Sequence, residues 1–173
     1  MKLTNNKSEG FTQPPEGVHS ALCVDVIDLG VVPTDFGPKH KVRLVFELEA
    51  CMEDGRPFIV SKSFNASMHA KSSLNAFISK WRGKPVAEGE TIDLDKLLGA
   101  SATLVLGAWV NGDKEGVGID AVSKPTKKLT ASGEYDPAAA RKRIAEKQSQ
   151  RGGAAAVAPA KTAPAEDKDD VNF

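Results

Sequence analysis

Cations spaced at the period of a β-strand are the first feature of this sequence that could do chemistry. Lys39, Lys41 and Arg43 recur at every second residue, and Phe36 lies just before them. Side chains two residues apart share one face of a strand. Cations can follow the phosphates of a single-stranded nucleic acid, while aromatic rings stack on its bases with little regard to base type. The pattern therefore indicates a surface for single-stranded nucleic acid, and an ordinary solvated strand face is the alternative.

More cations and rings follow along the chain. Lys62 separates Phe58 and Phe64, either of which could equally belong to a hydrophobic core. Trp109 lies next to a turn, on the face of its segment opposite to the leucines, and is the better candidate for an exposed ring. The predicted DNA-binding residues are Phe36, Lys39, Lys41, Arg43, Phe58, Lys62, Lys71, Lys80, Arg82 and Trp109.

The C-terminal end is acidic and closes on an aromatic residue. Residues 166–170 contain four carboxylates and one lysine, whereas residues 127–151 contain seven Lys or Arg and three Asp or Glu. A terminal Phe lowers solubility unless another molecule binds it, so this tip is predicted to bind a partner protein. The same carboxylates can compete with DNA for basic surface. The predicted partner-binding residues are Asp167, Asp169, Asp170, Val171 and Phe173.

No catalytic arrangement is recognisable in the sequence. It contains no HExxH motif, no phosphate loop and no GxSxG motif, and its three histidines are far apart. Four acidic residues cluster at a strand end and a turn, where solvated carboxylates are ordinary: Glu47, Glu49, Glu53 and Asp54. We therefore expect no catalytic residues, no metal and no cofactor, and a metal-dependent nuclease subunit is a less favoured alternative.

Length and composition indicate one intracellular domain with tails. The 173 residues carry 23 Lys or Arg and 23 Asp or Glu. Cys23 and Cys51 lie in apolar stretches without metal-ligand spacing, which predicts buried, reduced thiols in a cytosolic protein. The chain opens with polar residues, and no apolar run approaches the ~20 residues that cross a bilayer. The expected location is the cytoplasm.

The order of predicted elements indicates the fold class. Five strands are expected at residues 19–30, 40–50, 58–65, 100–110 and 117–123. A helix is expected within 66–84, where Leu74, Phe77, Ile78 and Trp81 form an apolar stripe. A mainly β, five-stranded OB-fold barrel with one helix between strands 3 and 4 has this order, which other small barrels and α+β domains share.

The domain prediction follows from changes in composition. The expected parts are an N-terminal arm (1–17), an OB-fold nucleic-acid-binding domain (18–128), a basic helix with a flexible Ala/Pro-rich linker (129–165), and the acidic tip (166–173). The helix is predicted at residues 136–150, with Pro137 at its start. It could extend the DNA-binding surface, contact a second copy, or be a solvated linker.

Two parts of the sequence resemble known proteins. Residues 10–128, above all "FGPKHKVRLVFEL" and "KSSLNAFISKWRGK", resemble bacteriophage single-stranded DNA-binding proteins of OB-fold type. The tail is similar to the acidic tip of bacterial single-stranded DNA-binding proteins, although Asn172 stands where that tip has Pro.

The resemblance implies a protein that coats single-stranded DNA in phage DNA replication and recombination, in the cytoplasm of the host cell. We expect it to act as a monomer or dimer. It also implies that the tip recruits replication or recombination proteins. RNA as the ligand remains an alternative, because stacking and phosphate contacts do not distinguish it from DNA. A protein-interaction or recombination adaptor, whose barrel is a docking module, is another.

Overall fold

The computed structural model describes residues 12–151, which divide into two compact units, the first ending at Pro137 and the second beginning at Ala138. The described part of the second unit, residues 138–151, belongs to the helix α2 (Pro137–Arg151), whose first residue is the last of the first unit. The first unit contains β1 (Gly17–Val32), β2 (Lys39–Cys51), β3 (Pro57–Asn65), α1 (Ser73–Arg82), the 3-10 helix η1 (Leu94–Leu97), β4 (Ser101–Asn111) and β5 (Lys114–Ser123).

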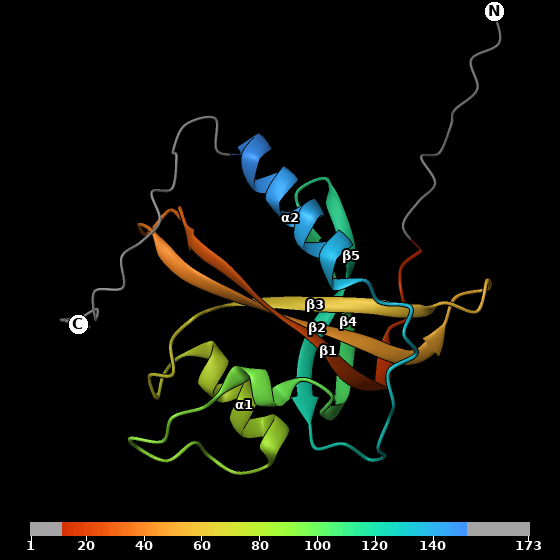
Figure 1. Ribbon diagram of the computed structural model, residues 1–173, viewed down its shortest axis with the longest axis horizontal. Helices are drawn as coiled ribbons and strands as arrows, with labels where there is room; N and C mark the ends of the chain where they lie inside the picture. Colours follow the sequence, from red (N-terminus) through yellow and green to blue (C-terminus); the bar gives the residue numbers. More distant parts are fainter. Residues whose placement is uncertain (1–11, 152–173) are drawn as a thin grey trace, which may run out of the picture. The chain divides into compact units, whose positions relative to one another are not determined.

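The five strands form one antiparallel sheet in the order β3-β2-β1-β4-β5 (Figure 1). This confirms a mainly β fold with one helix between the third and fourth strands, and α2 confirms the helix predicted near the C-terminal end. All five strands extend beyond their predicted bounds at one end or both, mostly by one or two residues. β1 continues through Val31 and Val32, and β5 begins at Lys114.

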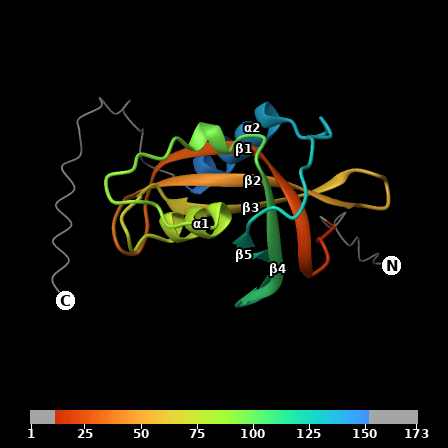
Figure 2. The same ribbon diagram turned by 90° about the horizontal axis from the view of Figure 1, so that it is seen from below.

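One face of the sheet packs against α1, and we call it the inner face. In Figure 1 α1 lies below the sheet, and Figure 2 shows it in front of β2 and β3. Phe46 of β2 packs against Phe77 and Trp81 of α1, with ring centroids 6.2 and 5.3 Å apart. The indole N–H of Trp81 donates to the carbonyl of Ser101 at 2.8 Å. The apolar stripe predicted for this helix is thus confirmed as core.

Two aromatic residues whose position the sequence left open belong to this core. Phe58 is 7% exposed and Phe64 is 4% exposed, both on the inner face of β3. The ring of Phe64 lies 4.9 Å from that of Phe77. The prediction of Phe58 as a stacking surface is therefore wrong, because its side chain is enclosed by the core.

The predicted faces of β1 are wrong because the strand contains an irregularity. The sequence places Leu22, Val24 and Val26 on one apolar face. The pairing register with β2 shifts between Cys23 and Asp25, which inserts one residue into the alternation. Cys23 belongs to the core and Val26 packs against it, whereas Leu22 is buried outside that cluster, on the opposite face.

The two cysteines differ in environment, and both are free thiols. Cys23 is buried, and burial raises the pKa of its thiol from 9.0 to about 12. Cys51 is exposed at the end of β2, so the prediction of two buried thiols is half wrong.

Several predictions concern residues outside the described range. Most of the N-terminal arm, the Ala/Pro-rich linker beyond residue 151 and the whole acidic tip lie there. No helix of residues 12–151 is long and apolar enough to cross a membrane.

Candidate nucleic-acid interface

The cations of β2 lie on the outer face of the sheet, away from α1. Lys39, Lys41 and Arg43 alternate with the core residues of that strand, and we call these three residues the basic track. Lys41 pairs with Asn65 of β3, and Arg43 pairs with Ser63, to which its Nε donates at 3.0 Å. Within residues 12–151 neither Lys39 nor Lys41 forms an ion pair. The track therefore has neutral neighbours on β3 and two uncompensated ammonium groups.

The β1–β2 hairpin extends beyond the rest of the sheet and carries Lys39, the outermost residue of the basic track. The ladder of β1 with β4 begins at Gly17 and ends at Leu22, and the ladder of β2 with β3 ends at Lys41. Beyond those points the two strands pair only with each other, and Figure 1 shows the resulting orange hairpin projecting on the left. His40 Nε2 and Asp28 Oδ1 brace it through a hydrogen bond of 2.6 Å.

The same carboxylate accepts a backbone hydrogen bond from Gly30 at 2.7 Å. Burial opposes ionisation of Asp28, but the hydrogen bonds from Gly30 and His40 outweigh it and lower the pKa of that carboxyl. Asp28 is therefore held in its charged form where the hairpin leaves the sheet.

A closed turn presents Phe36 at the tip of this hairpin. Thr34 and Gly37 exchange two backbone hydrogen bonds of 3.1 and 3.0 Å, and the Thr34 hydroxyl donates to the Gly37 carbonyl at 2.6 Å. Gly37 has φ +93°, which other residues rarely adopt, and Pro33 and Pro38 flank the turn. Phe36 is 92% exposed. The fold therefore holds one aromatic ring in solvent on a restrained turn.

Trp109 of β4 lies over a floor of glycines on β5. A Cβ atom on Gly116 would come within 2.8 Å of Trp109 Cζ2, and one on Gly118 within 3.2 Å of Cδ1. Only glycine at these positions lets the indole lie this close to the β5 backbone. The indole is 45% exposed, so it is supported on one side and open to solvent on the other.

Lys62 does not join the basic track. It pairs with Leu44 in the β2–β3 ladder and thus lies on the inner face. Its Nζ donates to the Ile119 carbonyl of β5 at 2.7 Å. This cation bridges the two edge strands of the sheet, which is a structural role that its spacing between two phenylalanines does not reveal.

The cations of the helical region also lie apart from the track. Lys71 precedes α1, and Lys80 and Arg82 belong to its last turns. Because α1 packs on the inner face, these residues and the basic track occupy opposite sides of β2. The cations that the sequence predicted as one DNA-binding set therefore lie on at least two separate surfaces.

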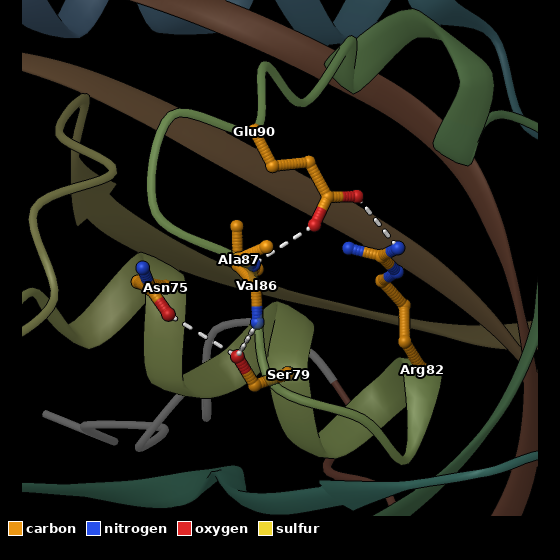
Figure 3. A network of polar contacts seen from close by, with 6 residues as sticks. All are labelled: Asn75, Ser79, Arg82, Val86, Ala87 and Glu90. Atoms are coloured by element: carbon orange, nitrogen blue, oxygen red, sulfur yellow. Dashed lines mark hydrogen bonds and ion pairs between the residues drawn. The ribbon is translucent and has the colours of Figure 1, made fainter.

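Arg82 has a structural role in the loop that follows α1 (Figure 3). Its Nη2 donates to Glu90 Oε1 at 2.7 Å, and Glu90 Oε2 accepts the backbone N–H of Ala87 at 2.9 Å. These two bonds lower the pKa of Glu90. Ser79 accepts the Val86 N–H at 3.2 Å, so both ends of the loop are tied to the helix.

The outer face holds all the buried polar side chains of the described chain. Asp25, Glu47, Ser101 and Thr103 come from β1, β2 and β4. Each accepts a hydrogen bond from residues 124–136, the segment after β5, which we call the strap.

The strongest contacts of the strap are made to the two carboxylates. Ser132 donates its backbone N–H and its hydroxyl to the two oxygens of Glu47, both at 2.9 Å. The hydroxyl of Tyr135 donates to Asp25 Oδ2 at 3.0 Å. Lys127 forms an ion pair with the exposed Glu49. The strap therefore runs from the end of β5 across the outer face of β1 and β2.

The strap corrects two expectations. Glu47 is 5% exposed and hydrogen-bonded, so it is not a solvated carboxylate. Residues 129–136, assigned to the linker from composition, lie within the first compact unit. Polar residues on outward positions of a strand are ordinary, so no sequence signal distinguished these anchors from solvated ones.

No group of three or more His, Cys, Asp or Glu that could hold a metal ion occurs in residues 12–151. No protein-family model matches the chain, and no curated protein matches it significantly.

Proposed function

We propose that this protein binds single-stranded DNA without strong sequence preference and does so without catalysing a reaction. The observation that carries the proposal is the basic track, whose three cations, including two lysines without an ion pair, lead along one hairpin to an exposed aromatic ring. Cations that follow phosphates and rings that contact bases are the two requirements for sequence-tolerant binding of a single strand.

Trp109 adds a second ring of a different kind. Its glycine floor supports one side of the indole and its open side can receive a base. Stacking of one base on such a ring contributes about 1–3 kcal/mol. The basic track would supply the salt-dependent part of the affinity, and the rings would supply the remainder.

We further propose that the sheet closes as an OB-fold barrel. The strand order β3-β2-β1-β4-β5 leaves β3 and β5 as the two edges, and the Lys62–Ile119 bond spans them. α1, which lies between β3 and β4 in the chain, packs into the core. These features support a barrel whose seam lies between β3 and β5.

The proposal includes a role for the acidic tip, which lies outside the described residues. Asp167, Asp169, Asp170, Val171 and Phe173 would bind a replication or recombination protein while the first unit holds DNA. An apolar pocket would take Phe173, and basic residues around that pocket would pair with the carboxylates. The protein would act as a monomer or dimer in phage DNA metabolism, in the host cytoplasm.

A docking module for another protein is the second candidate function. The exposed Phe36 favours it, because a single protruding aromatic residue is also a common anchor in protein interfaces. Full-length protein that binds the partner but has no affinity for DNA at low salt would support this alternative.

The direct test is a salt titration of oligo-dT binding with a charge variant and a matched control. The double variant Lys41→Ala, Arg43→Ala should lower the slope of log affinity against log salt by about 1.4, since each phosphate contact on a single strand contributes about 0.7. Lys96→Ala, which removes an exposed cation from η1, should leave the slope unchanged.

Three results would overturn the proposal: no binding of oligo-dT at low salt, equal binding of duplex DNA, or the same slope in the double variant. Competition by oligo-rU decides between DNA and RNA as the preferred ligand.

A further inference from the structure

The two exposed aromatic residues offer different geometries to a base. Trp109 has one side of its ring against Gly116 and Gly118, so a base can reach only the other side. Phe36 is 92% exposed, and both faces of its ring therefore meet solvent. A ring open on both faces can enter between two neighbouring bases, which a supported ring cannot do.

The hairpin holds Phe36 in place before any ligand binds. Three hydrogen bonds close the turn between Thr34 and Gly37, and the flanking Pro33 and Pro38 restrict the backbone on either side. The hydrogen bond between Asp28 and His40 braces the hairpin below the turn. The backbone of the turn therefore has little conformational freedom to lose when the ring enters a ligand, which favours insertion.

Charge along the hairpin orients a nucleic acid with its bases toward the tip. Asp35 is exposed in the turn beside Phe36, and its carboxylate repels phosphates. Lys39 and Lys41 lie further down the hairpin and attract them. A strand held by these lysines would therefore place its bases, and not its backbone, against Phe36.

We propose, on the basis of the function proposed above, that Phe36 is a wedge that inserts between two adjacent bases and separates them. Apolar side chains that enter a base step partly unstack it. At the end of a duplex the same insertion opens the terminal base pairs, so the hairpin gives the protein an activity that melts short duplexes beyond passive capture of single strands.

The test separates opening of a duplex from binding of a single strand. The substrate is a DNA hairpin with a single-stranded tail and a fluorophore–quencher pair at the end of its stem. The full chain is used at saturating concentration, and the affinity for oligo-dT is measured in parallel. Phe36→Ala removes the wedge, Phe36→Leu keeps an apolar wedge without an aromatic ring, and Val31→Ala removes another exposed apolar side chain from the same hairpin.

Phe36→Ala should slow stem opening about tenfold at saturation, a loss within the range of one base–ring contact. Phe36→Leu should stay within about threefold of the unaltered protein, because wedging requires apolar volume more than aromaticity. Val31→Ala should match the unaltered protein. Phe36 contributes almost nothing to the core, so all variants should fold, which circular dichroism checks.

Each contrary outcome has a distinct meaning. Unchanged stem opening in Phe36→Ala overturns the wedge. Equal losses in Phe36→Ala and Phe36→Leu, matched by equal losses of oligo-dT affinity, show a stacking platform and also overturn it. If the unaltered protein fails to bind oligo-dT, the proposed function itself is wrong, and this result is separate from the other two.

Discussion

Replacing Glu47 by Ala should release the middle of the strap from the sheet. This carboxylate is 5% exposed and accepts two hydrogen bonds of 2.9 Å from Ser132. A hydrogen bond to a charged group contributes about 1.5–3 kcal/mol to stability. Because Ser132 lies at the surface and can return to water, and because burying a carboxylate costs free energy, we expect Glu47→Ala to lower the free energy of unfolding by about 3 kcal/mol.

A double-mutant cycle isolates the side-chain bond from the backbone bond. Ser132→Ala deletes the hydroxyl that donates to Glu47, whereas the backbone N–H of residue 132 still reaches that carboxylate. The same hydroxyl accepts the backbone N–H of Glu134 at 3.1 Å, but Glu134 is exposed, so that N–H can bind water instead. It should cost about 1.5 kcal/mol in the unaltered protein and almost nothing once Glu47 is Ala. The coupling energy should therefore exceed about 1 kcal/mol.

Urea unfolding of the full chain at pH 7 measures these free energies. Ser123→Ala, an exposed serine at the end of β5, is the matched control and should be neutral. A loss below about 1 kcal/mol for Glu47→Ala, together with a coupling energy below about 0.3 kcal/mol, would refute the view that Glu47 anchors the strap.

Three further predictions concern the indole floor, the buried thiol and the core. Gly116→Val should displace the Trp109 ring, because a Cβ at residue 116 would lie 2.8 Å from Trp109 Cζ2. Tryptophan fluorescence should then shift and the affinity for oligo-dT should fall. An unchanged spectrum would contradict the view that Gly116 supports the indole. Burial raises the pKa of Cys23 to about 12, so the unfolded chain releases the thiol proton near pH 9 while the native state keeps it. The free energy of unfolding should then decrease above pH 9 by up to about 1.4 kcal/mol per pH unit, a slope that Cys23→Ala removes, and a thiol reagent should label only Cys51 in the native state. Phe58→Ala should cost about 3–5 kcal/mol in a thermal or urea melt, whereas a surface ring at that position would cost almost nothing.

Local patterns predicted most of the secondary structure because each element has one face that must be buried. In β2, Val42, Leu44, Phe46 and Leu48 occur at every second residue, and all four lie in the core. In α1 the apolar side chains recur at the helical period, and Gly83, with φ +68°, ends the helix as its position indicates. When one face of a strand or helix is buried, apolar residues recur at the period of that element. The positions of β2 and α1 could therefore be predicted from the sequence.

Reading buried faces from alternating residues failed in β1, where the pairing register with β2 is irregular. One extra residue between Cys23 and Asp25 moves the side chains of residues 25–28 to the other face, and a second irregularity between Asp28 and Gly30 restores the alternation. The predicted apolar face contains Leu22, Val24 and Val26, but Cys23 and Ile27 on the other face are apolar too, so the pattern does not mark the shift. Only pairing with β2 reveals which residues reach the core.

For the candidate site too, some features could be predicted from the sequence and others depend on the tertiary structure. Residue types and spacing by themselves determined that β2 carries cations at strand period, that Phe36 lies in a turn, and that Trp109 is an exposed ring beside a turn. These are local properties, set by alternation along one strand and by turn residues next to it. They predicted the basic track and both exposed rings without any knowledge of distant contacts.

Only the tertiary structure decided which charged residues are available to a ligand. Lys62 bridges β3 and β5, Arg82 holds Glu90, and Glu47 anchors the strap, yet each has the sequence context of an ordinary surface residue. The partners of these residues lie 57, 8 and 85 positions away along the chain. A charged side chain can bind a ligand only if the fold gives it no partner of its own. Those partners come from other segments of the chain, so local sequence patterns do not identify them.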